Sequence, residues 1–184
     1  KTYVAMLKKR FGSKRPAFDT LLVTGPLMDA RKRLRLQQAA QAGLALTVTE
    51  FTPRLYEYLT AADLVVSMGG YNTIVEILAA NQRGIIVPRV HPRLEQCIRA
   101  ERLAAKGLLE MIHPTKLTST RLFHAITQAL QRPRPPRSED IGIPLDGAAN
   151  VSRAMKQLFV DVQDIRTNHP PIPRPSGVHA LPRL

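Results

Sequence analysis

Apolar and polar residues alternate along residues 20–131 in the manner of a protein in which strands and helices follow one another. The short apolar runs predict five strands, at 20–24, 44–49, 63–67, 84–88 and 108–112. The stretches between them, with apolar residues at helical spacing, predict helices at 29–42, 54–60, 70–80, 94–106 and around 122–130. Because near-continuously apolar strands are covered on both faces, the pattern indicates an α/β fold with a parallel, Rossmann-like sheet between helices.

The regions on either side of this core differ from it in composition. Residues 1–16 hold six Lys or Arg and no acid, so we expect 1–19 to be a solvated basic linker from a preceding domain. Prolines in 132–137 break the pattern, and 132–165 predicts an irregular connection followed by one helix from Asp146, which packs back on the domain or bridges to a neighbour. The proline-rich residues 166–184 predict a disordered tail.

Composition and charge narrow the classes of function. With 184 residues and 44% hydrophobic residues, the chain can form one domain with a real core. Its net charge of +13 attracts phosphates, whether of nucleotides, nucleic acid or anionic lipid. The single cysteine excludes an internal disulfide, no Cys/His cluster has zinc spacing, and the apolar runs are too short for a membrane span. We expect part of a longer, cytoplasmic protein, without a metal.

The segment Ser67-Met-Gly-Gly-Tyr-Asn-Thr-Ile-Val-Glu76 joins the third predicted strand to its helix. Parallel sheets bind ligands at the carboxyl ends of their strands, and N–H groups in the first turn of a helix can hold a diphosphate. A tight turn that needs glycine for its backbone angles explains the segment equally well. The spacing of a Walker loop or of GxGxxG is missing, which counts against ATPase and NAD chemistry. The candidate diphosphate ligands are Gly69, Gly70, Tyr71, Asn72 and Thr73.

Glu76 has two interpretations. With Thr73 it matches a capping box, in which the glutamate accepts a hydrogen bond from the N-cap N–H group, and this is the safer one. Alternatively its carboxylate accepts hydrogen bonds from vicinal ribose hydroxyls, as an acidic group does in many nucleotide sites.

Further polar residues follow the other strands. Arg89 suits phosphate, and Glu95 and Gln96 suit sugar hydroxyls, although a plain polar loop explains each residue alone better. Thr24-Gly25 ends the first strand, where ordinary turn chemistry is sufficient. Phe51-Thr52 ends the second, where Phe51 is expected in the core and Thr52 as the N-cap of the next helix. Cys97 lies on an apolar helical face, which favours packing over nucleophilic chemistry.

The order of several short strings resembles the C-terminal domain of glycosyltransferase family 28 over roughly residues 20–131 and the helix near 147–160. This family includes the N-acetylglucosaminyltransferase that makes lipid II. The strings Met68-Gly-Gly-Tyr-Asn-Thr73 and Val87-Pro-Arg-Val-His-Pro-Arg-Leu-Glu-Gln96 are closer to a group of predicted bacterial glycosyltransferases. The other strings that carry the resemblance are Val48-Thr-Glu-Phe-Thr52, Ala62-Asp-Leu-Val-Val-Ser67 and Ile86-Val-Pro88.

The resemblance implies the carboxyl-terminal half of a two-domain GT-B enzyme, the half that holds a nucleotide-sugar donor. It places Gly69 and Gly70 at the diphosphate and Glu76 at the ribose. Gln96, with Glu95, would contact the donor sugar. It also places Phe51-Thr52 beside the base and Thr24-Gly25 in a phosphate-side loop, although Pro26 departs from the flexible turn of the family.

The implied reaction is inverting, metal-independent transfer from a nucleotide sugar, in the first instance a UDP-sugar, to a hydroxyl group. The general base would belong to an N-terminal acceptor-binding domain, so this chain alone is expected to bind donor without turnover. Three alternatives are a donor-binding subunit of a two-chain transferase, a GT-B nucleotide-sugar epimerase and, less favoured, a basic nucleic-acid-binding module. We expect no cofactor and no nucleic-acid partner, and leave open a peripheral contact of the basic flanks with an anionic membrane.

Overall fold

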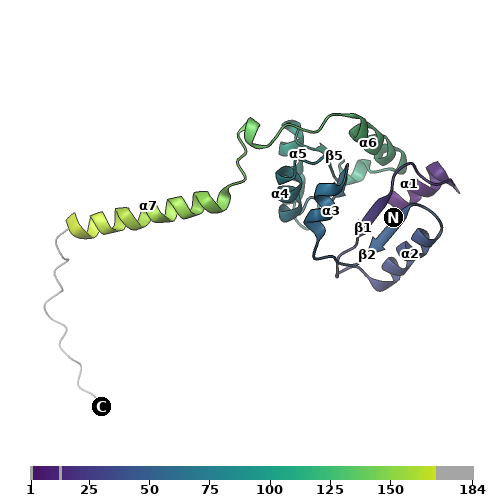
Figure 1. Ribbon diagram of the computed structural model, residues 1–184, viewed down its shortest axis with the longest axis horizontal. Helices are drawn as coiled ribbons and strands as arrows, with labels where there is room; N and C mark the ends of the chain where they lie inside the picture. Colours follow the sequence, from purple (N-terminus) through teal and green to yellow (C-terminus); the bar gives the residue numbers. More distant parts are fainter. Residues whose placement is uncertain (1, 13, 169–184) are drawn as a thin grey trace, which may run out of the picture. The chain divides into compact units, whose positions relative to one another are not determined.

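The computed structural model of the chain describes residues 2–12 and 14–168. The chain divides after Leu145 into a larger unit and a second unit that begins at Asp146. In the larger unit, short strands alternate with helices, which confirms the predicted α/β fold (Figure 1). The strands are β1 (Thr20–Val23), β2 (Leu46–Thr49), β3 (Val65–Ser67), β4 (Gly84–Ile86) and β5 (Glu110–Met111).

The helices of the larger unit lie between these strands, with one more at each side. They are α1 (Thr2–Phe11), α2 (Ala30–Gln41), α3 (Leu55–Ala61), α4 (Tyr71–Ala79), α5 (Glu95–Ala105) and α6 (Ser119–Gln131), with single 3-10 turns at Pro114–Lys116 and Glu139–Ile141. The five predicted helices correspond to α2–α6, each within a few residues of the expected bounds.

All strand pairs in the described residues are parallel, but they form two hydrogen-bonded pieces. β1 pairs with β2, and β3, β4 and β5 form the second piece in that order. Neighbouring residues of β4 point to opposite faces, as the pleat requires. Ile85 joins a core with α1, α2 and α6, whereas Ile86 joins a core with α3, α4 and α5. The sheet is therefore covered on both faces, as the apolar strands predicted.

The basic N-terminal segment is not a solvated linker. In α1 the side chains of Met6 and Leu7 are fully buried, and α1 packs against α6 (Figure 1). Tyr3 shares a hydrogen bond with Thr20 at the start of β1. Burial raises the pKa of Tyr3, and the bond to Thr20 opposes this effect in part. The prediction for residues 1–19 is thus wrong over α1, which belongs to the core.

The charges of α1 are compatible with this burial because of where they lie. Lys8, Lys9 and Arg10 occupy the last turn, where cations are favoured by the helix dipole. Arg10 also lies over the ring of Phe123, 4.4 Å from its centroid. Phe11 contacts the same ring edge-on. Charged residues at one end of a short helix therefore leave an apolar stripe free to pack.

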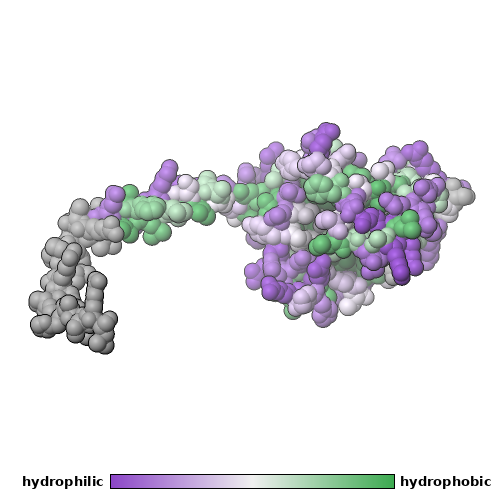
Figure 2. Space-filling view, turned by 90° about the horizontal axis from the view of Figure 1, so that it is seen from below, coloured by the Kyte–Doolittle hydropathy of each residue, from purple (hydrophilic) through white to green (hydrophobic). Residues whose placement is uncertain are grey.

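The described part of the second unit forms one long helix, α7 (Gly147–Asn168). It confirms the predicted helix from Asp146 and extends it by several residues, so residues 166–168 of the predicted tail are helical. The rest of that tail, 169–184, lies outside the described residues. The side chains of α7 up to Gln163 are exposed, including an apolar set that Figure 2 shows in green along the helix: Val151, Met155, Leu158, Phe159 and Val162.

Within the described residues, no helix combines the length and the apolar character needed to cross a bilayer.

Candidate functional site

The turn between β3 and α4 requires glycine at its first position. Gly69 has a φ of +74°, which L-residues with a side chain rarely adopt. A Cβ atom at Gly69 would lie 2.6 Å from Cγ2 of Ile86 on β4. The N–H group of Gly69 donates a hydrogen bond to Oγ of Ser67 at 3.1 Å. Gly70 differs, since a Cβ there would meet nothing within 4 Å. The turn is tight on the side of the sheet and open on the other side.

The first turn of α4 has unused hydrogen-bond donors. Gly70 is the N-cap and supplies no side chain, and the first helical bond runs from N–H of Ile74 to the carbonyl of Gly70 at 3.0 Å. Among the described residues, none accepts a hydrogen bond from the N–H groups of 70–73. These donors stand at the positive end of the helix dipole, so the turn can bind an anion.

The helices that follow the strands differ in how they begin. α2 is capped by Asp29, which accepts from N–H of Lys32, and α6 by Thr118, which accepts from N–H of Arg121. At the N-caps of α3, α4 and α5, no side chain accepts a hydrogen bond from a backbone N–H group of the first turn. The uncapped starts therefore belong to the three helices that succeed β2, β3 and β4.

Glu76 lies within α4 and does not form a capping box. The helix begins at Tyr71, so Thr73 is inside its first turn rather than at the N-cap, and the safer interpretation of Glu76 is wrong. The side chain is half-buried, and no described residue forms a hydrogen bond or ion pair with it. By helical spacing it shares a face with Asn72 and Thr73. Its carboxylate is therefore available to a ligand that extends from the open turn.

The loop after β4 is held by Gln96. Its Oε1 accepts a hydrogen bond from the backbone N–H of Arg89 at 3.1 Å, across the loop that leads into α5. The peptide bond between His91 and Pro92 in this loop is cis. Arg89 and Arg93 are exposed. The amide oxygen of Gln96 is thus used within the protein, while its NH₂ group remains able to donate to a sugar.

The carboxylate of Glu95, which was expected to contact the donor sugar, is engaged within the protein. Its carboxylate forms an ion pair with Arg99, one turn further along α5. The guanidinium of Arg99 also lies over the ring of Tyr71, 5.3 Å from its centroid. The i,i+4 spacing of Glu95 and Arg99 could have indicated their ion pair, but the contact of Arg99 with Tyr71 lies between two helices and has no sequence signal.

The loops after β1 and β2 are joined by backbone hydrogen bonds. N–H of Thr24 donates to the carbonyl of Thr49 at 3.0 Å, and N–H of Gly25 donates to that of Glu50 at 2.9 Å. Gly25 has a φ of +75°, which explains the glycine by turn geometry. Phe51 is 67% exposed, so the expectation of a core position is wrong and its ring is available to a ligand.

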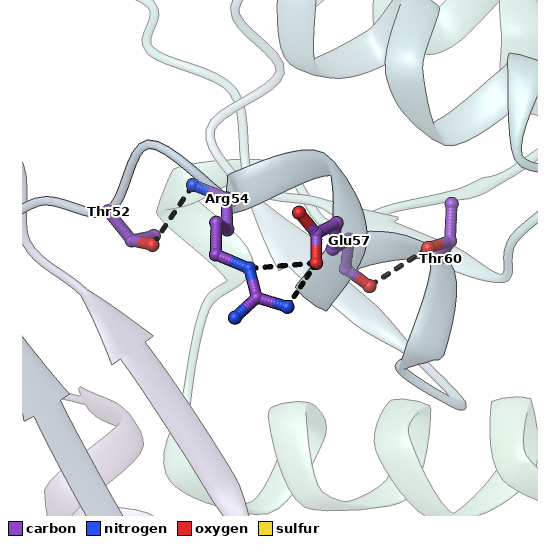
Figure 3. A network of polar contacts seen from close by, with 4 residues as sticks. All are labelled: Thr52, Arg54, Glu57 and Thr60. Carbon is purple, nitrogen blue, oxygen red and sulfur yellow. Dashed lines mark hydrogen bonds and ion pairs between the residues drawn. The ribbon is translucent and has the colours of Figure 1, made fainter.

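The start of α3 is held by its own side chains (Figure 3). Oγ1 of Thr52 accepts a hydrogen bond from N–H of Arg54 at 3.2 Å, and Nε of Arg54 donates to Glu57 at 2.8 Å. Oγ1 of Thr60 donates to the carbonyl of Glu57. The sequence predicted Thr52 as the N-cap of this helix. The N-cap is instead Arg54, because Thr52 closes a turn just before the helix.

Two other features have no part in this site. Hollows of about 420 and 340 Å³ lie along α2 and beside the start of β2, not at the turn before α4.

Cys97 is buried, and burial raises the pKa of its thiol, with a further contribution from Glu101, to which the thiol donates a hydrogen bond. A raised pKa favours the protonated thiol, which is a poor nucleophile. Among the described residues, no cluster of His, Cys, Asp and Glu could hold a metal ion.

The fold is similar to that of solved glycosyltransferases. The structure of VinC in complex with dTDP superimposes with a TM-score of 0.59 at 19% identity, covering 85% of this chain and 37% of that one. The MurG of Acinetobacter baumannii superimposes with a TM-score of 0.52 at 16% identity, covering 78% and 43%. Likeness at this level of identity establishes the Rossmann-like half of the GT-B fold.

Curated relatives at the level of sequence share one name, UDP-N-acetylglucosamine--N-acetylmuramyl-(pentapeptide) pyrophosphoryl-undecaprenol N-acetylglucosamine transferase. That of Bacillus cytotoxicus is 28% identical over 158 residues, and that of Bacillus licheniformis 26% over 151 residues. These matches cover 82% and 79% of this chain but only 42% and 41% of the relatives. The chain thus spans about two fifths of their length. Residues 3–155 match the glycosyltransferase family 28 C-terminal domain, and the chain belongs to that family.

Proposed function

We propose that this chain is the nucleotide-sugar-binding half of an inverting, metal-independent glycosyltransferase, and that its donor is a UDP-sugar. The observation that carries the proposal is the uncapped start of α4, where the N–H groups of 70–73 have no acceptor among the described residues. A diphosphate would supply the missing acceptors at the positive end of the helix. The names of the curated relatives favour UDP, and the nucleotide in the VinC structure, dTDP, carries a closely related pyrimidine base.

The site residues divide the donor between them in this proposal. The turn at Gly69 and Gly70 and the start of α4 bind the diphosphate, with Arg89 adding positive charge. Glu76 accepts hydrogen bonds from the ribose, and exposed Phe51 flanks the base beside Thr52. Gln96 donates its amide NH₂ to the sugar. Thr24 and Gly25 line the phosphate side of the neighbouring loop.

The reaction proposed is a displacement at the anomeric carbon. An acceptor hydroxyl attacks this carbon while the bond to the diphosphate breaks, and the configuration inverts. Negative charge grows on the departing diphosphate, and backbone N–H groups with the helix dipole stabilise this charge without a metal ion. The general base that removes the hydroxyl proton would belong to an N-terminal acceptor-binding domain of the same protein, since the curated relatives are more than twice as long as the matched region. We place this enzyme in the cytoplasm, with peripheral contact to the inner face of the membrane.

A titration of this chain with a panel of nucleotides and nucleotide sugars tests the proposal. We expect UDP and UDP-N-acetylglucosamine to bind more tightly than ADP, and RNA not to compete. Glu76→Ala should lower the affinity for UDP by about 10- to 150-fold, because a charge-assisted hydrogen bond contributes roughly 1.5–3 kcal/mol. The affinity for inorganic pyrophosphate should stay as in the unchanged chain, since the diphosphate is bound elsewhere.

The control is Glu139→Ala in the 3-10 turn Glu139–Ile141, an exposed glutamate outside the site, which should leave UDP binding intact. Thermal unfolding of the Glu76→Ala chain should occur near the normal temperature because no cap is lost. An equal fall in UDP and pyrophosphate affinity, or steeply salt-dependent RNA binding that UDP does not displace, would contradict the proposal.

A further inference from the structure

One side chain connects the two helix starts that form the candidate donor site. Arg99 lies in the second turn of α5, and its guanidinium faces the ring of Tyr71, the first residue of α4. On its own helix it pairs with the carboxylate of Glu95, the first residue of α5. Tyr71, Arg99 and Glu95 are called the α4–α5 bridge below.

The guanidinium is the enclosed member of the bridge. The side chain of Arg99 is 22% exposed, whereas that of Glu95 is 63% exposed and Tyr71 as a residue is 65% exposed. A partly desolvated guanidinium between a ring and a carboxylate is attracted by both. Its long side chain is therefore fixed in one place, which a solvated arginine would not be.

The position of the bridge relates it to the open turn. Tyr71 carries one of the N–H groups without an acceptor, and Glu95 precedes Gln96, whose oxygen holds the loop after β4. The bridge thus joins the segment proposed to bind a diphosphate to the segment proposed to bind a sugar. Since Glu95 is engaged by Arg99, its carboxylate acts within the protein, and the amide of Gln96 is left to meet the sugar.

We propose that Arg99 is a positioning residue that sets the spacing between the start of α4 and the Glu95-Gln96 segment. This inference rests on the proposed function. The spacing matters only for a ligand that touches both segments. Arg99 therefore makes the site select a nucleotide sugar over the bare nucleoside diphosphate. Arginine suits this role better than lysine because its planar group stacks on a ring and pairs with a carboxylate at the same time.

The experiment measures the affinities for UDP and UDP-N-acetylglucosamine by calorimetry in the chain and its variants. In Arg99→Met the affinity for the nucleotide sugar should fall about fivefold more than that for UDP, as the sum of one cation–π contact and one ion pair. Tyr71→Leu removes only the cation–π contact, so its selective loss should be smaller, and that of Tyr71→Phe smaller again, because the ring is kept. The double variant of Arg99→Met and Tyr71→Leu should be no worse than Arg99→Met alone, since the loss of Arg99 already removes the contact with the ring.

Two results would overturn the inference alone: an equal loss for both ligands in Arg99→Met and Tyr71→Leu, or additive losses in the double variant. Arg99→Lys retains the ion pair and should lie between the unchanged chain and Arg99→Met. If the unchanged chain binds neither ligand, the proposed function fails and this inference with it. Should Arg99→Met not fold, Tyr71→Leu against Tyr71→Phe decides the question.

Discussion

Two kinds of helix start occur after the strands of this domain, and they serve different ends. α2 and α6 begin with a side chain, Asp29 or Thr118, that accepts from an N–H group of the first turn. α4 and α5 begin without such an acceptor. A capping side chain stabilises a helix by roughly 1 kcal/mol relative to Ala and by a few tenths relative to Gly, so its omission has a cost unless a ligand takes its place. The contrast separates helix starts that support the fold from those kept available for an anion.

The largest effect is expected at the turn that opens α4. Gly69→Ala forces a side chain into a left-handed conformation and onto Ile86, so we expect a loss of about 2–4 kcal/mol in the free energy of unfolding. The matched variant Gly70→Ala meets open space at a φ of −55° and should lose less than about 1 kcal/mol. Urea denaturation measures both. Similar losses in the two variants would show that the turn does not have this geometry.

An acceptor added at the N-cap of α4 should raise the stability of the domain and weaken its binding of UDP. Gly70→Asp supplies an acceptor for the first turn of α4 and should raise stability by about 0.3 kcal/mol. The same carboxylate repels a diphosphate, so we expect UDP affinity to fall at least about tenfold, by the competition of two anions for one helix end.

Gly70→Ser is the uncharged control for this variant. It competes for the same N–H groups without the charge, and its UDP affinity should lie between those of the unchanged chain and Gly70→Asp. Unaltered UDP binding in Gly70→Asp would mean that the diphosphate lies elsewhere.

Removal of the cap of α6 should lower the stability of the domain and leave its affinity for UDP unchanged. Thr118→Ala removes the hydrogen bond to N–H of Arg121 and should cost about 1 kcal/mol of stability without a change in UDP affinity. Thr120→Ala, an exposed neighbour in the first turn of α6, should stay within about 0.5 kcal/mol of the unchanged chain. Thermal or urea unfolding with a UDP titration checks both. A drop in UDP affinity for Thr118→Ala would abolish the distinction between the two kinds of start.

The smallest effect concerns Cys97, in the first turn of the uncapped helix α5. A helix start lowers the pKa of a thiol, but here burial, together with Glu101, raises the pKa above its usual 9.0. The alkylation rate should therefore rise with pH only beyond the range typical of exposed thiols, and Glu101→Gln should move this midpoint down. Because the folded pKa is the higher one, stability should decline as pH rises through it. A midpoint below the ordinary value would show that the helix end dominates.

Much of the fold could be predicted because its signals are local. Apolar runs such as 84–88 and the glycine after α5 mark strands and helix ends without reference to the rest of the chain. At that helix end, Gly107 has a φ of +73° and donates to the carbonyl of Ala104 at 2.9 Å, as a helix-ending glycine should. A turn that needs glycine was one of two interpretations of the segment around Gly69, and the physical cause of this need, the contact with Ile86, came only from the structure.

The errors arose where local signals compete. In α1 the count of lysines and arginines concealed a stripe of Tyr3, Leu7 and Phe11 at helical spacing, which would have predicted burial. Thr73 and Glu76 have capping-box spacing, but α4 starts two residues earlier, at Tyr71. Glu95 and Arg99 have the i,i+4 spacing of an ion pair within one helix, but the contact of Arg99 with Tyr71 joins two helices, which no sequence spacing shows.

Arg83 is one of several cations that lie at the carboxyl-terminal ends of helices in this domain. Its guanidinium donates to the carbonyl of Arg132, where α6 ends, at 3.0 and 2.8 Å, and the last turns of α1 and α5 also carry cations. The negative ends of α1, α5 and α6 are thus each met by a cation, while among the described residues no side chain caps the positive end of α4. If the diphosphate binds as proposed, this distribution of charge would draw it to the start of α4.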